Sequence, residues 1–177
     1  MRQLETRRLI LRPFRDSDAA DVFDYARDPR VGPAAGWPPH KSPAESLEII
    51  RTVFAAPGTA AVVLKETGRV VGSAGFVGRH RTELPGPDDE IGYALHPGCW
   101  GRGLMPEAVE ELLRYGFEEL DLRTIWCGHY DFNDRSRRVV EKCGFRWRLT
   151  DRTWVELMGE ERTELHYALT KEEWQAR

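Results

Sequence analysis

Cysteine is scarce in this 177-residue chain, and its spacing forms no metal-binding or disulfide pattern. Cys99, Cys127 and Cys143 stand 28 and 16 residues apart, which gives neither paired zinc ligands nor an even count for a disulfide framework. No histidine joins them at the spacing of metal ligands. We therefore expect a protein of the reducing cytoplasm that uses no metal.

Excess positive charge and long apolar runs are also missing. Twenty-six Lys and Arg against 29 Asp and Glu give 26 − 29 = −3, so no positive field gathers nucleic acid or anionic lipid. The longest strictly hydrophobic run, Ala60–Leu64, is far shorter than the ~18 residues that cross a bilayer. The opening segment, MRQLETRRLILRPF, is too charged for an export signal. We expect a soluble protein that binds neither nucleic acid nor membrane.

Three common active-site motifs are missing as well. The chain has no GxxxxGK loop, which NTPases need, and no GxSxG elbow, which would support a hydrolase. A dinucleotide-binding fingerprint fails because Pro106 stands where the third glycine belongs. These absences argue against nucleotide hydrolysis, ester hydrolysis and a Rossmann dehydrogenase.

Composition and patterning indicate one globular domain over residues 1–177. Hydrophobic residues make up 41% of the chain, which suffices for one sizeable core at this length. Strands are expected at 9–14, 59–65, 69–79, 89–96, 124–129, 145–150 and 163–169, and helices at 16–26, 43–54, 104–117 and 133–143. A capping box, Ser42-Pro43-Ala44-Glu45, opens the second of these helices. This order predicts an α/β fold with one mixed sheet flanked by helices.

The glycine-rich loop at 98–107 is the most informative segment, because it joins the strand at 89–96 to an amphipathic helix. Glycines let backbone N–H groups approach a ligand closely, and the helix N-terminus adds partial positive charge. A phosphate or pyrophosphate is the expected guest. A ligand-free structural turn is the alternative that the loop alone leaves open.

Two linked motifs carry a resemblance to a known family. The segments EIGYALHPGCWGRGLMPEA and NDRSRRVVEKCGFR resemble the RimJ/RimL-type branch of the Gcn5-related N-acetyltransferase (GNAT) superfamily. The matching positions are Trp100, Gly101, Gly103, Glu107, Ala108, Asn133, Ser136, Glu141, Lys142, Gly144 and Phe145. The opening TRRLILRPFRDSDAADVFDY is similar to this branch too, so the likeness covers nearly the whole chain. It implies a single-domain GNAT-like fold with a mixed, largely antiparallel central sheet.

The resemblance implies an acetyl-CoA site and a transferase that needs no metal. The cofactor-binding residues that it implies are Tyr93, Ala94 and Leu95 along the pantetheine arm, Gly101, Arg102, Gly103, Leu104 and Met105 at the pyrophosphate, and Asn133 and Ser136 at the arm and sulfur. Backbone donors near Leu95 would polarise the thioester carbonyl as charge develops. Helix capping alone is the alternative role for Asn133 and Ser136.

Two departures from the family pattern affect the roles of single residues. Many members carry a tyrosine acid at the position of Val140, so Ser136 is the candidate acid here. Gly98 replaces the usual glutamine or arginine, so the anion site would either be weaker or rely on Arg102. These two departures also leave open a non-catalytic acyl-CoA sensor.

Glu90 is the candidate base, because its strand borders the acceptor site in this fold and a carboxylate can take a proton directly or through water. A solvated edge carboxylate is the alternative. On the same face, His96 is expected to be structural, and the weaker candidates are His80, His129 and His166.

The acceptor is expected to be a primary amine, of a protein N-terminus or of a small molecule such as an antibiotic. An α-amine has a pKa of ~7.7 to 8.0 against ~10.4 for lysine, so it needs less help from a base. The walls of the acceptor site are expected from the proline-rich segment 28–43 and the loop 79–89. Trp37 in the first of these is expected to pack on prolines rather than cover a ligand. A homodimer through Leu165, Tyr167 and Leu169 competes with burial of that face in the core.

Overall fold

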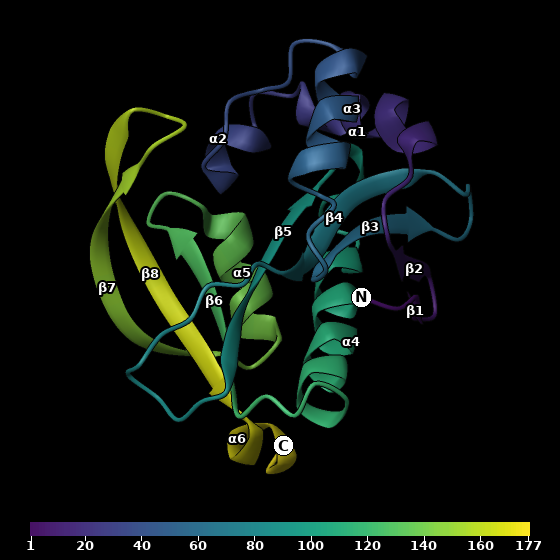
Figure 1. The fold of residues 1–177 in the computed structure, drawn as a ribbon. Coiled ribbons are helices and arrows are strands. Elements are labelled where there is room, and N and C mark those ends of the chain that lie inside the picture. The colour runs from purple at the N-terminus through teal and green to yellow at the C-terminus, as the bar shows by residue number, and fades with distance from the viewer.

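The computed structural model describes all of residues 1–177, and one eight-stranded sheet runs through it in the order β1-β2-β3-β4-β5-β6-β8-β7 (Figure 1). The strands are β1 (Leu4–Glu5), β2 (Leu9–Arg12), β3 (Thr59–Leu64), β4 (Val70–Phe76), β5 (Asp88–Leu95), β6 (Thr124–Tyr130), β7 (Arg146–Val155) and β8 (Glu160–Thr170). Every neighbouring pair is antiparallel except β5 and β6. The predicted mixed, largely antiparallel sheet is confirmed.

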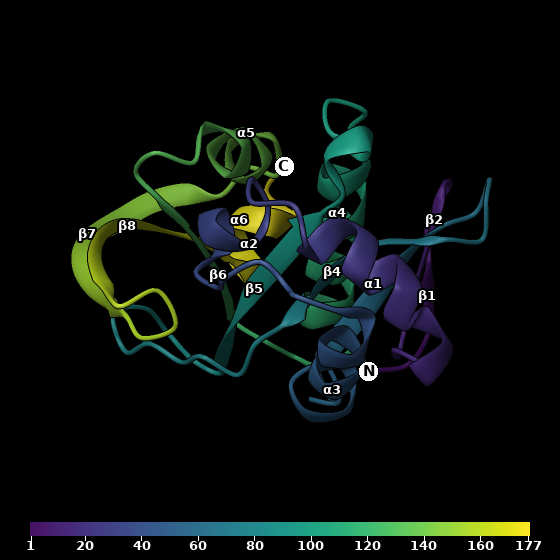
Figure 2. The same ribbon diagram turned by 90° about the horizontal axis from the view of Figure 1, so that it is seen from above.

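Six α-helices and two 3-10 turns accompany the sheet. They are η1 (Asp16–Asp18), α1 (Ala19–Ala26), α2 (Gly32–Ala35), α3 (Pro43–Thr52), η2 (Pro97–Cys99), α4 (Leu104–Glu118), α5 (Asp134–Lys142) and α6 (Lys171–Gln175). Figure 2 shows α4 and α5 on one side of the sheet and α1 and α3 on the other. These sides are called the α4–α5 face and the α1–α3 face below.

The larger core lies on the α4–α5 face. Twenty-seven buried residues form it, among them Leu112 of α4, Val140 of α5 and Ile91 of β5. A second cluster of nine buried residues lies under α1 and α3 and includes Ala94 of β5. Adjacent strand residues point to opposite faces, so β5 contributes side chains to both cores.

The parallel pair β5 and β6 separates after a short stretch, and this separation positions the site. Their register runs from Asp88 with Thr124 to Glu90 with Trp126 and then stops. From Ile91 onward β5 pairs only with β4, and the second half of β6 pairs only with β8. The two strands diverge towards the top of Figure 1. The backbone pairing therefore has a gap in the middle of the sheet, which both faces border.

Several element boundaries differ from the predictions. The strand predicted at 69–79 ends at Phe76, and the last two strands are longer than predicted and form one long hairpin. The elements β1, α2 and α6 were not predicted, because short elements carry little periodicity. Half of the predicted capping box forms: Ser42 accepts from the Glu45 N–H at 3.1 Å, whereas Glu45 accepts from the Lys41 N–H instead of closing the box.

The apolar face of β8 is buried inside the molecule rather than offered to a partner. Tyr167 and Leu169 belong to the larger core, and Leu165 packs against it. Burial in the core, the expected use of this face, is confirmed, so it supplies no dimer contact. None of the helices has the length and apolar character that spanning a membrane requires.

Candidate active site

The gap between β5 and β6 exposes backbone polar groups of β5. The Glu90 carbonyl accepts from the Val77 N–H, and the His96 N–H donates to the Val71 carbonyl, so the peptide groups of even-numbered residues face β4. Because the direction of the peptide groups alternates along a strand, the N–H and C=O groups of Tyr93 and Leu95 face the gap. No strand pairs with them there. The Leu95 carbonyl is taken by the Trp100 indole N–H at 2.9 Å. The N–H groups that remain can serve an extended amide-containing ligand.

The glycine-rich loop forms a run of free donors at the start of α4. None of the five N–H groups from Gly101 to Met105 donates a hydrogen bond to a protein group, and Pro106 has no N–H. Gly101 and Gly103 hold φ angles of 74° and 71°, a left-handed conformation that strains other residues. Five consecutive donors at a helix N-terminus suit an anion with several oxygens.

Glu107, one turn into α4, connects this loop to the segment that leads into β2. Its carboxylate accepts from the Arg8 guanidinium at 2.6 Å, the Arg8 N–H at 2.7 Å and the Thr6 hydroxyl at 2.5 Å. Arg8 donates in turn to the Arg102 carbonyl at 2.9 Å. The glutamate of the sequence motif is therefore a structural clamp that fixes the shape of the loop.

Cationic side chains surround the tryptophan that precedes the loop. The Arg135 guanidinium of α5 lies 4.1 Å from the centre of the Trp100 indole, and that of Arg30 lies 5.5 Å from it. Arg30 is paired with Asp28 at 2.7 Å, and Arg102 is 3.5 Å from Glu66. Arg135 forms no ion pair. Arg135 is therefore a second cation, besides the predicted Arg102, that can add positive charge near the loop. The sequence did not point to it, because Arg135 belongs to the other motif.

The second motif starts α5 beside the gap. Asn133 caps the helix through its Oδ1, which accepts from the Ser136 N–H at 3.1 Å, and its amide donates to the Ala34 carbonyl at 3.0 Å. The capping role is thus present, and one amide hydrogen is left over. Ser136 is 8% exposed, and its Oγ lies 2.7 Å from the Tyr93 hydroxyl. Burial raises the pKa of Tyr93 well above its ordinary value.

Val140, at the position where many family members carry a tyrosine, is fully buried in the larger core. The structure thus has no hydroxyl there, and the hydroxyls beside the gap on this face belong to Ser136 and Tyr93. Ser136 lies on α5 and Tyr93 on β5, and the sequence alone does not predict that their hydroxyl groups come within hydrogen-bond distance.

Glu90 lies on the α1–α3 face at the last paired position of β5. It is 5% exposed, so the alternative of a solvated edge carboxylate is wrong. Its Oε1 accepts from Arg79 at 3.0 Å, whereas its Oε2 is buried without a hydrogen-bond partner. Burial raises the pKa of Glu90, opposed by the cationic charge of Arg79. A carboxylate in this state is a stronger base than one in water.

Glu164, which the sequence did not single out, lies near Glu90, and His166, one of the weaker histidine candidates, lies beside Glu164. Glu164 of β8 is 8% exposed and shares Arg79 with Glu90. His166, two residues on, is 2% exposed, and burial lowers its pKa. In the sequence, Glu164 and His166 are marked only by the alternation of polar residues along β8. This alternation does not show which strand the two side chains face.

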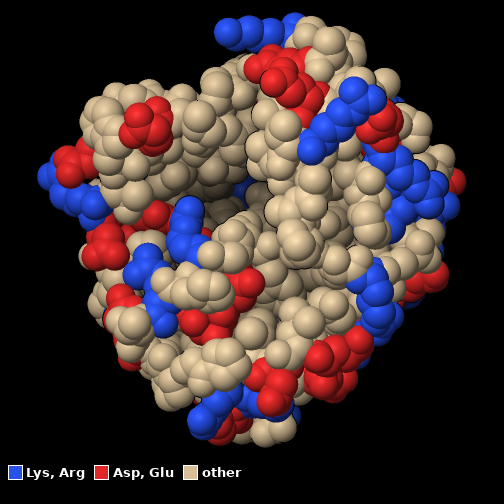
Figure 3. Space-filling model, viewed as in Figure 1, with Lys and Arg blue, Asp and Glu red and all other residues tan.

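His96 and Trp37 have structural roles in this arrangement. His96 accepts from the Gly98 N–H at 2.9 Å and so caps η2, the structural role that was expected. Trp37 packs against Gly32, beside the second core cluster. In the view of Figure 3, the surface has a hollow between the lobe of the β7–β8 hairpin and the part that carries α3. Acidic and basic side chains lie along the lower rim of this hollow.

Known proteins are similar to this chain in sequence and in fold. The family model described as "Acetyltransferase (GNAT) domain" matches residues 8–146. A Bacillus licheniformis protein named "Uncharacterized N-acetyltransferase p20" is 30% identical over 151 residues, which cover 82% of this chain and 83% of that protein.

Two solved structures superpose closely. The GNAT-family acetyltransferase from Bacillus anthracis has a TM-score of 0.83 at 25% identity and covers 97% of this chain and 99% of its own. The ribosomal-protein-S5-alanine acetyltransferase from Vibrio fischeri has a TM-score of 0.73 at 20% identity, with 98% and 99% covered, and shows the shared fold. The resemblance predicted from the two motifs is confirmed, and the chain is an acyltransferase that belongs to the GNAT acetyltransferase family.

Proposed function

We propose that this enzyme transfers the acetyl group of acetyl-CoA to a primary amine by direct attack on the thioester. The observation that carries the proposal is the run of five free N–H groups from Gly101 to Met105 at the N-terminus of α4, next to the gap in the sheet. GNAT domains use acetyl-CoA as the donor. The donors of this loop match the oxygens of its pyrophosphate.

The remaining groups around the gap fit the rest of the donor molecule. The free N–H groups of Tyr93 and Leu95 suit the amides of a pantetheine arm, with Ala94 between them turned to the other face. Arg135 and Arg102 supply positive charge beside the phosphate-binding loop. When bound, acetyl-CoA supplies an activated acetyl thioester, whose carbonyl carbon an amine attacks.

The two faces of the sheet divide the proton transfers. Glu90 on the α1–α3 face takes a proton from the acceptor, directly or through water, and its buried Oε2 is free to do so. Ser136 on the α4–α5 face donates a proton to the departing sulfur, and Tyr93 orients its hydroxyl. Because both faces border the gap, the base and the acid act from opposite sides of one thioester.

A protein N-terminal α-amine is the acceptor that we favour, and this places the enzyme in the RimJ/RimL-type branch. The low pKa of an α-amine suits a single buried carboxylate as the base. The likeness to the Vibrio fischeri enzyme adds support at the level of the fold. A small-molecule amine or an antibiotic is the second acceptor class, and a non-catalytic acyl-CoA sensor is the competing function.

Calorimetric titration with acetyl-CoA, with NAD as the control ligand in the same buffer, tests the donor site. We expect saturable one-site binding of acetyl-CoA and none of NAD. Absence of acetyl-CoA binding would overturn the proposal. A thiol-release assay over a panel of amines then separates the enzyme from the sensor, since tight binding without any turnover would favour the sensor.

A further inference from the structure

Two buried carboxylates on the α1–α3 face share one cation. Arg79 places its Nη1 3.0 Å from an oxygen of Glu90 and 3.6 Å from an oxygen of Glu164. Both glutamates are more than nine-tenths buried, whereas the Arg79 side chain is 56% exposed. The ionised trio carries one more negative than positive charge. Buried carboxylates are costly without compensating cations, so this group is one cation short.

The neighbouring charges do not supply that cation. The groups that face Glu90 are Arg79, Glu164, Arg81 and Asp89. Arg81 is already within 3.4 Å of Glu83 and 3.7 Å of Asp151. His166 packs against the Arg81 guanidinium, and its burial favours the neutral ring. The pair of glutamates is left with Arg79 as its close cation.

Unsatisfied polar atoms gather at the same place. Five buried side-chain nitrogen or oxygen atoms in the protein lack a hydrogen-bond partner, and three of them belong to this cluster: Glu90 Oε2, Trp126 Nε1 and Arg81 Nε. Trp126 pairs in register with Glu90, and Arg81 lies 5.5 Å from the centre of its indole. Buried polar groups are normally paired. Three exceptions side by side indicate a site that a polar ligand completes.

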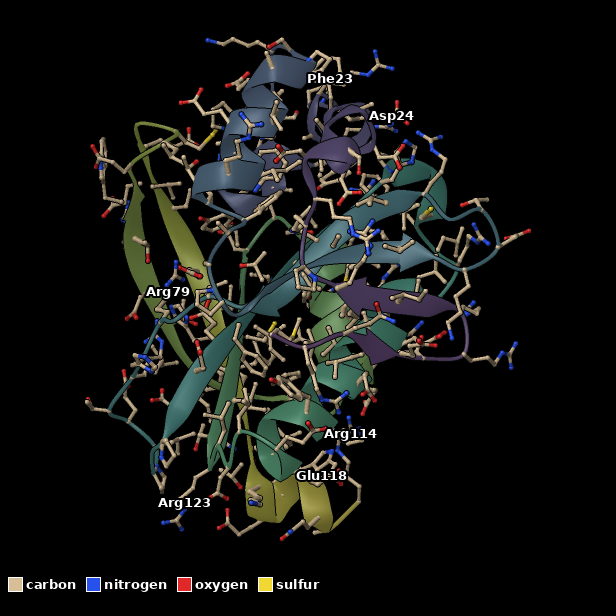
Figure 4. All side chains as sticks on the ribbon, turned by 45° about the vertical axis from the view of Figure 1, so that its right-hand side comes forward. Phe23, Asp24, Arg79, Arg114, Glu118 and Arg123 are labelled. Atoms are coloured by element: carbon tan, nitrogen blue, oxygen red, sulfur yellow. The ribbon has the colours of Figure 1, made fainter.

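Arg79 can leave the cluster at low cost. It lies on the loop between β4 and β5 and comes in beside β8 (Figure 4). The backbone on either side is held, because the Gly78 N–H donates to Asp89 and the Arg81 N–H donates to Asp88, so only the exposed Arg79 side chain has to move. An ion pair made by a solvent-exposed arginine contributes little to stability. A ligand cation can therefore replace it while the buried carboxylates stay compensated.

We propose that Glu90 and Glu164 bind the acceptor amine in its protonated form, and that Arg79 is the cation that the acceptor displaces. The inference rests on the proposed transfer to an amine and adds the acceptor's charge state and a specificity residue, Glu164. The ammonium group passes one proton to Glu90 Oε2, which gives a neutral amine and a protonated carboxyl group. The amine nitrogen then bonds to the acetyl carbon as the carbon–sulfur bond breaks, and Ser136 protonates the departing thiolate. The second proton lost by the nitrogen returns to Ser136 through water, and the proton on Glu90 leaves to solvent. Glu164 keeps its charge throughout and only positions the acceptor.

The acceptor class follows from this charge requirement. Alkyl and α-amines are cations at neutral pH and match the glutamate pair. Arylamines are neutral there and do not. In a panel of L-alaninamide, n-butylamine and aniline, we expect turnover of the first two and none of aniline. Turnover of aniline at a comparable rate would overturn the proposal.

A matched pair of variants isolates Glu164. Glu164→Gln removes the charge at nearly constant shape, and Glu161→Gln is the control on the exposed part of the same strand. With L-alaninamide, Glu164→Gln should raise KM about tenfold or more, as expected for loss of a charged hydrogen-bond partner, with kcat within about twofold. Arg79→Ala should lower KM. An unchanged KM in Glu164→Gln, or a fall in kcat alone, would overturn the positioning role.

A second measurement does not depend on turnover. The carboxyl carbons of Glu90 and Glu164 can be titrated by NMR in protein labelled at glutamate Cδ, with single Gln variants assigning each signal. We expect Arg79→Ala to raise the pKa of Glu90, because the carboxylate loses its only close cation. Unchanged titrations would overturn the role of Arg79. Absence of acetyl-CoA binding would instead remove the proposed function and leave this result standing.

Discussion

At the scale of single residues, surroundings separate side chains of the same type. Asp89 and Glu90 are adjacent, yet Asp89 accepts from the Gly78 N–H at 2.8 Å and from the Glu90 N–H at 2.7 Å, and so holds the loop. Glu90 keeps one buried oxygen without a partner. The first carboxylate therefore has a structural role, whereas burial raises the pKa of the second and makes it the better proton acceptor.

Ser136→Ala tests the assignment of the acid. We expect kcat to fall about 100-fold, within the range of general acid catalysis, with little change in the affinity for acetyl-CoA. Steady-state kinetics over a pH series measures this. The control is Tyr93→Phe, which removes the same hydrogen bond from the other side. If Ser136→Ala left the chemical step unchanged, or if Tyr93→Phe alone abolished it, Ser136 would not be the acid.

Glu90→Gln tests the base and has opposite effects on activity and stability. The pKa of Glu90 is raised in the folded protein, mainly by burial, so its ionisation destabilises the fold as pH rises through that pKa. The Glu90→Gln variant has no carboxyl group at this position, so it lacks this destabilising ionisation. We expect thermal unfolding at about pH 8 to show a more stable variant, with the difference closing below about pH 4, where the carboxyl becomes protonated in both states.

The activity of the same variant should fall about 100-fold, most strongly at low pH, where deprotonation of the amine is hardest. Glu161→Gln, exposed on β8, should change neither property. A variant that lost stability at high pH, or that kept full activity at low pH, would contradict the role of Glu90.

At the scale of elements, local signals were predictable and strand pairing was not. The glycine-rich loop and the Asn133 cap follow from residue types at fixed spacing, and both form, whereas the capping box at Ser42 forms only in half. The gap at Ile91 depends on where β5 and β6 cease to pair, which no local pattern records. Glu164 stands 74 residues after Glu90, since 164 − 90 = 74, and meets it only through the sheet order. The site was therefore predicted on its donor side and missed in part on its acceptor side.

The glycine-rich loop offers a matched test of the phosphate cradle. Gly101 and Gly68 hold φ angles of 74° and 70°, and a Cβ at either position would meet no atom within 4 Å. Alanine should therefore strain both turns equally, at about 1 to 2 kcal/mol. Only Gly101→Ala should also weaken acetyl-CoA binding, about tenfold, because its Cβ would stand before the free N–H groups. Equal affinities of the two variants in calorimetry would remove the loop from the binding site.

At the scale of the whole molecule, the sheet works as two halves joined at a gap. The half from β1 to β5 carries the phosphate-binding loop and Glu90, and the half from β6 to β8 carries Ser136 on the following helix and Glu164. Between them the only backbone ladder is the short parallel stretch that ends at Glu90 and Trp126. A ligand that lies in the gap contacts both halves, so its binding free energy also stabilises their arrangement.

Acetyl-CoA should therefore stabilise the whole protein and protect amides at the gap. At a hundredfold excess over Kd, binding adds about 2.7 kcal/mol, which for a chain of this size raises Tm by roughly 5 to 10 °C. Hydrogen exchange should slow most at Tyr93, Leu95 and the N–H groups from Gly101 to Met105, because these donors lack protein partners and border the gap and the phosphate-binding loop. NAD should change neither quantity. Protection confined to the loop, with Tyr93 and Leu95 exchanging as before, would mean that the phosphates bind while the arm lies outside the gap.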